Sequence, residues 1–393
     1  MAQGLPSINI SFQQEGISAI KRGARGIVAL ILKDTKAVGN HTIFDVTDIP
    51  SELGEENKDL ISQALIGNTN APKRVELFVL GADGELSNAL DYFEVTKFDY
   101  LAYPKAESED KTAIKSWIKA LRDNEGIMAK VVLAKENGDH EGIINVTQDG
   151  VVIGGKTYNA GEFTARVAGL IAGTDLRIAT TYANLTDVTE IPFEKKLSTS
   201  EKIANGEFVL FKEAGKIKVA RGVNSLISTS QVKGEAFQKI KLVDIMDLIS
   251  NDIRETAREN YLGKYANSYD NKCLLITAIS GYFDGLINDG LVERNTVNVG
   301  IDLDAQKAYL KSVGTDISEW TEQQIKEANT SDKVFISVKC KILDAIEEIN
   351  LRVFIWCNRR NGSSINKESK RLNVDFITAK RAIKRLEDGI YDL

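Results

Sequence analysis

Cysteine and histidine are scarce in this sequence of 393 residues. The three cysteines, Cys273, Cys340 and Cys357, are odd in number and form no CxxC pair, which argues against a disulfide framework or a zinc site. Cys273 and Cys340 lie within apolar patterns and are interpreted as core residues. The two histidines, His41 and His140, are few for a Ser-His-Asp or Cys-His site, and both are interpreted as surface-loop residues. We therefore expect no catalytic site, no cofactor and no metal.

Long apolar runs are also missing. No stretch of 18 or more apolar residues is present, so no membrane insertion is expected. The first residues show no basic-then-apolar pattern, so no signal peptide is expected. A net charge of −6 gives no general reason to expect nucleic acid or an anionic membrane as a partner. The length allows two or three domains that each bury a core.

The N-terminal half alternates short apolar runs with helical patterns. In residues 107–126 the apolar positions fall at i, i+3, i+4 and i+7, and a glycine follows as a helix stop. Asn159 is placed to cap a further apolar helix. Strand–helix alternation of this kind favours an α/β fold with a mostly parallel, helix-covered sheet. The expected strands are residues 26–33, 75–80, 98–103 and 129–134.

Beyond Thr180 the pattern changes to that of an α+β domain. Residues 206–222 read as a hairpin with Ala214-Gly215 in its turn, and two long helical stretches follow, at 234–260 and 270–290. Four carboxylates of the first stretch are interpreted as a solvated helix face; they are Asp244, Asp247, Asp252 and Glu255.

Each end of the chain carries an amphipathic strand that has no partner nearby in the sequence. Near the start, Ile8, Ile10 and Phe12 alternate with polar residues. Near the far end, Ile349, Leu351, Val353 and Ile355 alternate with other residues in the same way. The backbone groups of a strand need partners, so both strands are expected to pair with something distant.

The string "GVVIGGKT", Gly150 to Thr157, matches the P-loop pattern GxxxxGK[ST]. Three β-branched residues in its centre are typical of a strand, and Gly-containing turn signals stand on both sides. We interpret the segment as a hairpin, and an NTP-binding site remains an alternative.

The last 38 residues are basic, with nine Lys/Arg and five Asp/Glu from Trp356 to Leu393. Ser364 is placed to cap a first helix and Asn373 to form a turn before a basic second helix, which resembles a helix-turn-helix. A basic helical surface appendage is favoured over DNA binding, which remains a second alternative.

Seven segments in order resemble the tail sheath proteins of contractile-tailed phages and of phage-tail-like bacteriocins, especially those of Gram-positive bacteria. The segments are "GLPSINISF", "RGARGIVALILKD", "HEGIINVT", "FTARVAGLIAGT", "GEFVLFKEAGKIKVARGVNSL", "NSYDNKCLLI" and "KILDAIEEINL". They span residues 1 to about 355, and the basic tail from Trp356 departs from the family pattern. The implied division is a 1–25 arm and linker, a 26–175 α/β domain, a 176–345 α+β domain, a 346–355 arm strand and the 356–393 extension.

The resemblance implies a structural subunit rather than an enzyme. Sheath subunits form a helical homopolymer around an inner tail tube protein by exchanging terminal strands, which is β-augmentation between neighbours. They then contract into a wider, shorter cylinder and drive the tube through the target envelope. Baseplate and tail-terminator proteins are further implied partners. The resemblance also implies that the subunit is made in the bacterial cytoplasm and is then incorporated into a tail. Gly16, Gly23 and Gly26 are expected to act as hinges of the N-terminal arm.

Overall fold

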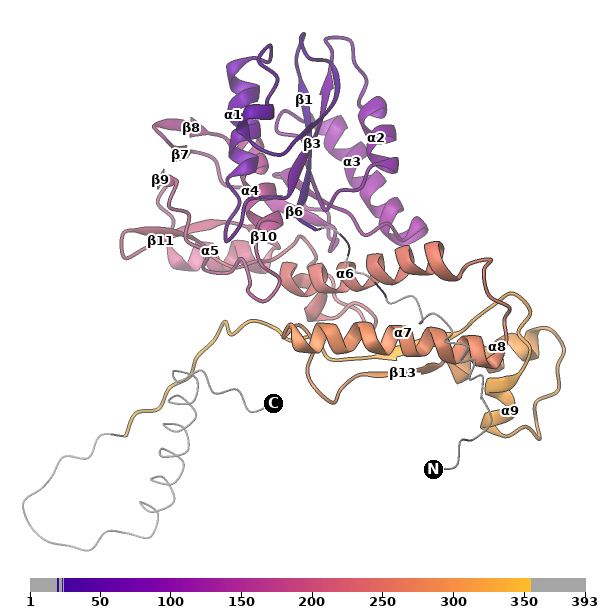
Figure 1. Ribbon diagram of the computed structural model, residues 1–393. Helices are drawn as coiled ribbons and strands as arrows, with labels where there is room; N and C mark the ends of the chain where they lie inside the picture. Colours follow the sequence, from indigo (N-terminus) through magenta and orange to yellow (C-terminus); the bar gives the residue numbers. More distant parts are fainter. Residues whose placement is uncertain (1–19, 21–22, 24, 355–393) are drawn as a thin grey trace, which may run out of the picture. The chain divides into compact units, whose positions relative to one another are not determined.

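The computed structural model describes residues 20, 23 and 25–354, and the chain divides into two units, 1–347 and 348–393. A seven-stranded sheet with the order β10-β6-β5-β4-β1-β3-β2 forms the centre of the first unit (Figure 1). All neighbours in it are parallel except β2, which runs antiparallel to β3 at one edge. The strands are β1 (Ile27–Lys33), β2 (Gly39–Ile43), β3 (Arg74–Leu80), β4 (Tyr100–Ala102), β5 (Lys130–Ala134), β6 (Ile143–Val146) and β10 (Glu207–Phe208).

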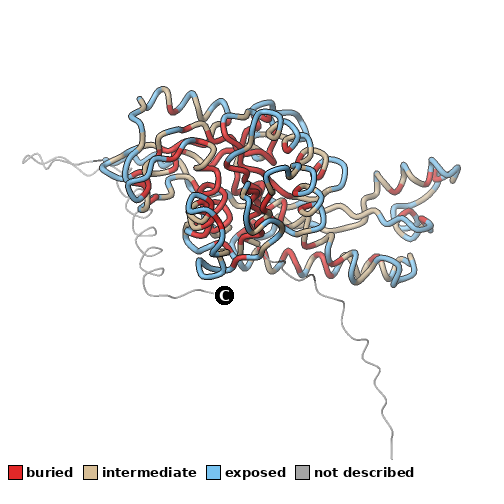
Figure 2. Tube along the Cα trace, turned by 90° about the horizontal axis from the view of Figure 1, so that it is seen from above, coloured by how far each residue is buried: buried red, intermediate tan, exposed pale blue. Residues whose placement is uncertain are grey.

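Helices cover both faces of this sheet, as expected for continuous apolar strands. On one face α1 (Glu55–Leu65) packs against α4 (Ala160–Ala172), and a Cβ atom at Gly169 would overlap the Ala64 carbonyl of α1. On the other face lie α2 (Leu86–Val95) and α3 (Ser108–Ala120), which bury Phe93 and Ile118. Figure 2 shows buried residues, in red, concentrated in the interior, with exposed residues, in pale blue, around them. The predicted mostly parallel, helix-covered α/β fold is confirmed.

The hairpin predictions are also confirmed. β7 (Val151–Ile153) and β8 (Lys156–Tyr158) are antiparallel, and β9 (Val188–Glu190) completes their three-stranded sheet. β11 (Leu210–Glu213) and β12 (Lys216–Val219) are joined by Ala214 and Gly215, whose φ values of 49° and 79° are those of a type I′ turn.

The remainder of the first unit is built on two long helices, α6 (Ile240–Thr256) and α7 (Tyr269–Asn288). Ile245 of α6 and Phe283 of α7 share one apolar core, against which residues of a small sheet pack. That sheet consists of β13 (Asn298–Ile301) and β14 (Ile336–Lys339), antiparallel to each other. The other helices are α5 (Lys196–Ala204), α8 (Leu303–Ser312) and α9 (Glu322–Glu327); short 3-10 turns, η1 (Val46–Asp48) and η3 (Glu235–Gln238), and π turns, η2 (Leu121–Glu125) and η4 (Ala257–Tyr261), complete the described elements.

Two observations bear on the sequence-based outline. His41, expected in a loop, lies in the edge strand β2, whose polar residues gave no strand signal but pair in register with β3. β10, from beyond residue 176, joins the same sheet as β1. The boundary between 26–175 and 176–345 stays a prediction.

No helix of the described part is long and apolar enough to cross a membrane.

Candidate functional site

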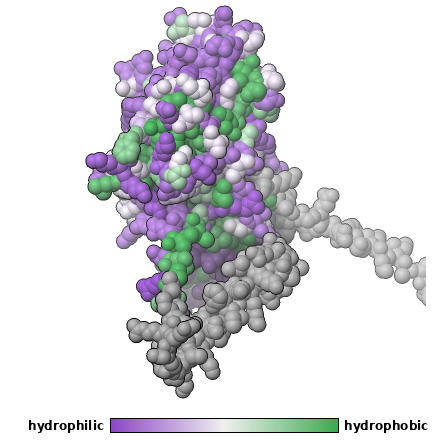
Figure 3. Space-filling view, turned by 90° about the vertical axis from the view of Figure 1, so that its left-hand side faces the viewer, coloured by the Kyte–Doolittle hydropathy of each residue, from purple (hydrophilic) through white to green (hydrophobic). Residues whose placement is uncertain are grey.

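The apolar side chains expected on the C-terminal strand are exposed. Ile349, Leu351 and Val353 are 81%, 79% and 69% exposed, and Ile346 is 85% exposed. Apolar surface, green in Figure 3, is visible on the face of the molecule drawn there. A row of exposed large aliphatic side chains is typical of a surface that another protein covers. Ile8, Ile10, Phe12, Gly16 and Ile355, with the basic extension from 356, lie outside the described residues.

The β13–β14 sheet has open edges. It contains two strands, so each strand is paired on one side only within the described part of the chain. An unpaired edge presents a row of N–H and C=O groups that another strand can pair with. This small sheet therefore offers two positions for added strands.

The N-terminal segment is fastened where it enters the fold. The Gly23 N–H donates to Asp252 Oδ1 at 2.8 Å, and a Cβ at Gly23 would lie 2.9 Å from the same oxygen. Gly26 has a φ of +88°, and its N–H donates to Asp99 Oδ2 at 2.7 Å. At Gly26 a Cβ would lie 3.0 Å from the Ala172 carbonyl oxygen instead, so each glycine leaves room that a side chain would fill. The hinge role of Gly16, Gly23 and Gly26 stays a prediction.

Arg25 extends this attachment into the interior. Its guanidinium pairs with Asp244 of α6, and Nη1 donates to the Thr174 carbonyl at 3.0 Å. Burial works against the charged guanidinium, but Asp244 raises the pKa of Arg25 above its ordinary value. Tyr100 also donates to Asp244, and burial followed by the Asp244 charge raises the Tyr100 pKa well above its ordinary value.

Asp247, one helical turn further on, continues the network. Arg122 donates to both of its carboxylate oxygens at 2.8 and 2.9 Å, and Lys130 Nζ donates to Oδ2 at 2.5 Å. Lys130 also lies 3.1 Å from Asp244 Oδ1, so it joins the two aspartates. Burial alone would raise the pKa of Asp247, but Lys130 and Arg122 hold it below its ordinary value.

The prediction that these carboxylates form a solvated face was wrong. Asp244, Asp247 and Asp252 are 4%, 4% and 1% exposed, because α6 lies beside the starting ends of β1, β4 and β5, where cations and donors meet its aspartates. Glu255 alone of the four is on the outside, paired with Lys97 at 2.9 Å. Removing one partner from a buried ion pair costs about 3–5 kcal/mol, so these contacts hold α6 on the sheet.

The C-terminal segment is fastened by a different set of contacts. Glu347 accepts hydrogen bonds from Thr181 Oγ1 at 2.6 Å, Arg221 Nε at 3.1 Å and Lys239 Nζ at 3.2 Å. Lys239 also pairs with Asp344. Burial would raise the pKa of Glu347, but Thr181 and Lys239 hold it below its ordinary value. Lys239 is the N-cap residue of α6, so this contact too is made at that helix.

The P-loop look-alike lacks a phosphate cradle. Gly154 and Gly155 form the turn of the β7–β8 hairpin, and Lys156 Nζ donates to Asp59 of α1 at 2.7 Å. Tyr158 donates to the same carboxylate at 2.8 Å. The lysine of the pattern is thus paired with a carboxylate, and its glycines make a hairpin turn instead of opening a helix whose N–H groups could hold phosphate.

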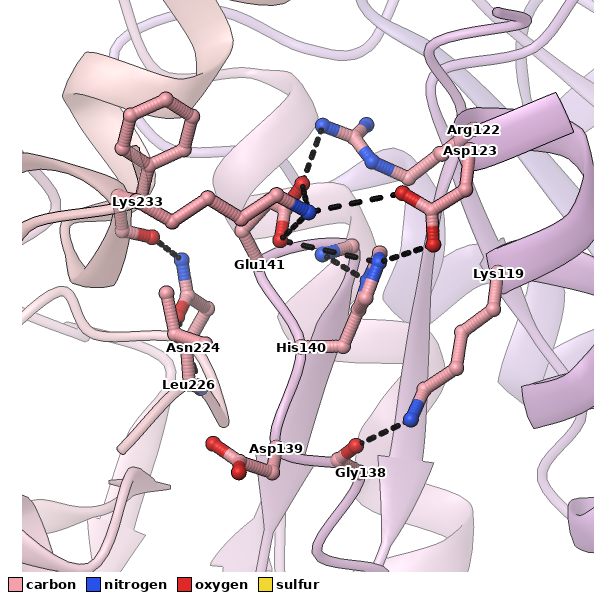
Figure 4. Close-up of polar contacts among 12 residues, drawn as sticks. Lys119, Arg122, Asp123, Gly138, Asp139, His140, Glu141, Asn224, Leu226 and Lys233 are labelled. Carbon is pink, nitrogen blue, oxygen red and sulfur yellow. Dashed lines mark hydrogen bonds and ion pairs between the residues drawn. The ribbon is translucent and has the colours of Figure 1, made fainter. Parts of the chain in front are cut away.

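His140 is buried within a partly exposed cluster of charged residues, and its interpretation as a surface-loop residue was wrong. It is 6% exposed, and its Nε2 lies 3.5 Å from Asp123 Oδ2 and 3.7 Å from Glu141 Oε2 (Figure 4). Lys233 Nζ donates to both Glu141 oxygens, at 2.9 and 3.1 Å. Burial lowers the pKa of His140 despite the neighbouring Glu141 charge.

Asp123, His140 and Glu141 have the residue types of a metal site, but the hydrogen bonding does not fit one. The Gly142 N–H donates to His140 Nδ1 at 3.0 Å, so Nε2 carries the hydrogen of the neutral ring and offers no lone pair to a cation. Metal-binding histidines instead donate the N–H of their second nitrogen. Lys233 supplies the positive charge between the carboxylates. The cluster therefore fastens the loop that carries Lys233 to the sheet.

Sequence reasoning missed both attachment points. Nothing local in the sequence links Arg25 to Asp244 or Glu347 to Arg221, because their partners are more than 100 positions away. The one usable signal was the pair of aspartates at a spacing of three, Asp244 and Asp247, within an otherwise apolar helical pattern. Charges at such positions are buried only with partners.

Comparisons with known families match most of the chain. The profile described as "Phage tail sheath protein central domain" matches residues 81–225, and "Phage tail sheath C-terminal domain" matches residues 232–355. The second match ends where the basic extension begins. A tail sheath protein of a Clostridium phage, phiCD119, is 42% identical over 355 residues, which cover 89% of this chain and 99% of that protein.

Other relatives are more distant. The Bacillus subtilis phage-like element PBSX protein XkdK is 32% identical over 41% of this chain and 35% of its own length. The sheath tail protein of Desulfitobacterium hafniense has a similar structure, with a TM-score of 0.63 at 20% identity over 75% of this chain and 94% of that one. A chain of the anti-feeding prophage baseplate reaches a TM-score of 0.61 at 15% identity, covering 91% of this chain and 100% of that one. These two structures show a shared fold.

Proposed function

The chain belongs to the phage tail sheath family, and from that membership we propose that it polymerises helically around an inner tube by exchanging terminal strands. The polymer contracts to drive the tube through the envelope of the target cell. The subunit acts as a structural protein without catalysis, in a phage tail or phage-tail-like particle. Its partners are copies of itself, an inner tail tube protein, and the baseplate and tail-terminator proteins at the two ends.

The observation that carries this proposal is the uncovered apolar row on Ile349, Leu351 and Val353. Covering one such side chain contributes roughly 1.5–3 kcal/mol, while ordering the backbone costs about 1–2 kcal/mol per residue. One arm therefore binds only marginally by its side chains. Backbone pairing and repetition along the helix have to supply the rest.

The open β13–β14 sheet is the acceptor that fits this arrangement best. It offers two strand edges, and the sequence predicts two terminal strands for each subunit to donate. The arms are residues 1–25 and 346–355, with Ile8, Ile10 and Phe12 as the buried face of the first. The division of the subunit at residues 175 and 345 is part of the same proposal.

Leu351→Asp tests the exchange directly. A buried carboxylate without a partner is strongly unfavourable, so this variant should stay folded and fail to polymerise. Asn350→Asp adds the same charge at a neighbouring position that faces the opposite side of a strand, and it should still form tubes. Sedimentation, circular dichroism and negative-stain electron microscopy measure these outcomes.

Ile10→Asp, or deletion of residues 1–15, should block assembly from the other end of the chain. Normal tubes from both Leu351→Asp and Ile10→Asp would contradict strand exchange. Unfolded aggregates would instead mean that these strands belong to the core of the subunit.

A further inference from the structure

One helix holds the exit points of both terminal segments. Asp244 and Asp252 of α6 bind Arg25 and the Gly23 N–H, close to where the N-terminal segment enters the fold. Lys239, at the N-cap of the same helix, binds Asp344 and Glu347, where the C-terminal segment leaves. Any pull on either arm is therefore transmitted to α6.

The two attachments differ in burial. Asp244 and Asp252 are almost completely buried, and Asp252 also accepts from the Tyr282 hydroxyl at 2.8 Å. Lys239 and Asp344 keep 29% and 34% of their side chains exposed and Arg221 keeps 36%, whereas Glu347, which their contacts surround, keeps 9%. Water can take the place of the partner charge in a partly exposed ion pair, and salt screens the attraction. A buried charge that loses its partner finds no water to replace it.

The C-terminal attachment also lacks backbone support. The last backbone hydrogen bond to another segment among the described residues is from the Leu343 N–H to the Leu291 carbonyl, at 2.9 Å. Beyond it, residues 344–347 are held by the side chains of Asp344 and Glu347, and Ile346 between them points to solvent. This four-residue piece can separate without breaking a sheet.

We propose that residues 344–347 form a latch that opens when the sheath contracts, whereas the N-terminal attachment at Arg25 stays closed. The inference rests on the proposed function, since it requires the C-terminal arm to be bound to a neighbour. Contraction gives a wider cylinder, so neighbouring subunits in a ring move apart. The C-terminal arm then has to span a longer distance between its own subunit and the neighbour that binds it. Four released residues add up to about 13 Å of extended chain.

Zero-length carbodiimide cross-linking of the full chain tests the latch. It joins the Lys239 amine to the Asp344 or Glu347 carboxylate only while the latch is closed. Mass spectrometry should find this link in extended sheaths and several-fold less of it in contracted sheaths, with the Lys97–Glu255 link of α6 as an internal control of unchanged yield. Equal yields in the two states would overturn the latch and leave the sheath function intact.

Two variants give a second measurement. Glu347→Gln removes the latch charge, so its extended sheaths should contract in a lower concentration of urea than unmodified sheaths. The control variant Glu56→Gln removes an exposed carboxylate of α1 that pairs with Lys105. Sheaths of this variant should contract like those of the unmodified chain. A Glu347→Gln sheath with an unchanged threshold would also overturn the latch. Failure of the unmodified chain to form tubes would overturn the sheath function and the latch together.

Discussion

Arg122 holds Asp247 with two parallel hydrogen bonds, of 2.9 and 2.8 Å, across 125 positions of sequence. The pair joins η2, which directly follows α3, to α6 and lies almost completely inside the protein, with side chains 5% and 6% exposed. A bidentate guanidinium–carboxylate contact fixes orientation as well as distance. It therefore sets how α6, which carries both arm attachments, sits on the sheet.

Arg122→Met should destabilise the subunit by about 3–5 kcal/mol, because Asp247 would lose one of its two buried cations. Urea unfolding followed by circular dichroism measures the change. The double variant Arg122→Met/Asp247→Leu should recover part of the loss, since no unpaired carboxylate is left and Lys130 keeps Asp244 as its partner. A single variant as stable as the unmodified chain would show that the pair does not hold α6.

The stability of the subunit should fall in acid through Asp247. The pKa of this carboxyl is lowered in the folded protein, so its contribution is fully present above the ordinary unfolded value and is lost as pH falls through the lower, folded value. Burial raises the pKa of Asp99, which acts in the opposite direction. Unfolding free energies measured from pH 7 down to 3 should decline less steeply for Asp247→Asn than for the unmodified chain.

Lys156→Ala should leave folding and assembly essentially unchanged. Its contact with Asp59 is partly exposed, with side chains 42% and 29% accessible, and such pairs contribute about 0–1 kcal/mol. Calorimetric titration with ATP is the measurement. Binding that is present in the unmodified chain and disappears in this variant would revive the P-loop interpretation of Gly150 to Thr157.

Truncation after Ile355 should still give tubes if the basic extension is an appendage. The family profile ends at residue 355 and so does not include the extension. Electron microscopy of the truncated chain tests this expectation, and a gel-shift assay at physiological salt tests the DNA-binding alternative. Loss of tubes would place residues 356–393 among the subunit contacts.

Local patterns predicted much of the fold. Asn159 caps α4 through a capping box with Glu162, and Ala214-Gly215 makes the predicted turn, because both depend on residues that are adjacent in sequence. β1 was predictable since residues 27–32 are apolar and buried on both faces. The polar edge strand β2 was not, because its register comes from β3.

The candidate sites were predictable to a smaller degree. Alternation at Ile349 and Leu351 predicts a strand, but the described residues 346–354 form no strand and both side chains are exposed. Their role in an arm strand between subunits stays a prediction. Asp244 and His140 were misjudged because burial of a charge or an imidazole depends on distant partners. Arg25 and Glu141 supply those partners only after the chain has folded.

The two-stranded β13–β14 sheet has a consequence for how a tube must end. If each subunit donates two strands and accepts two, every terminal strand and every edge of a β13–β14 sheet is paired in the interior of the tube. At one rim acceptor edges are left empty, and at the other donor strands are left without a host. The two rims then differ chemically, which gives the tube a polarity, and each needs its own protein to stop further growth.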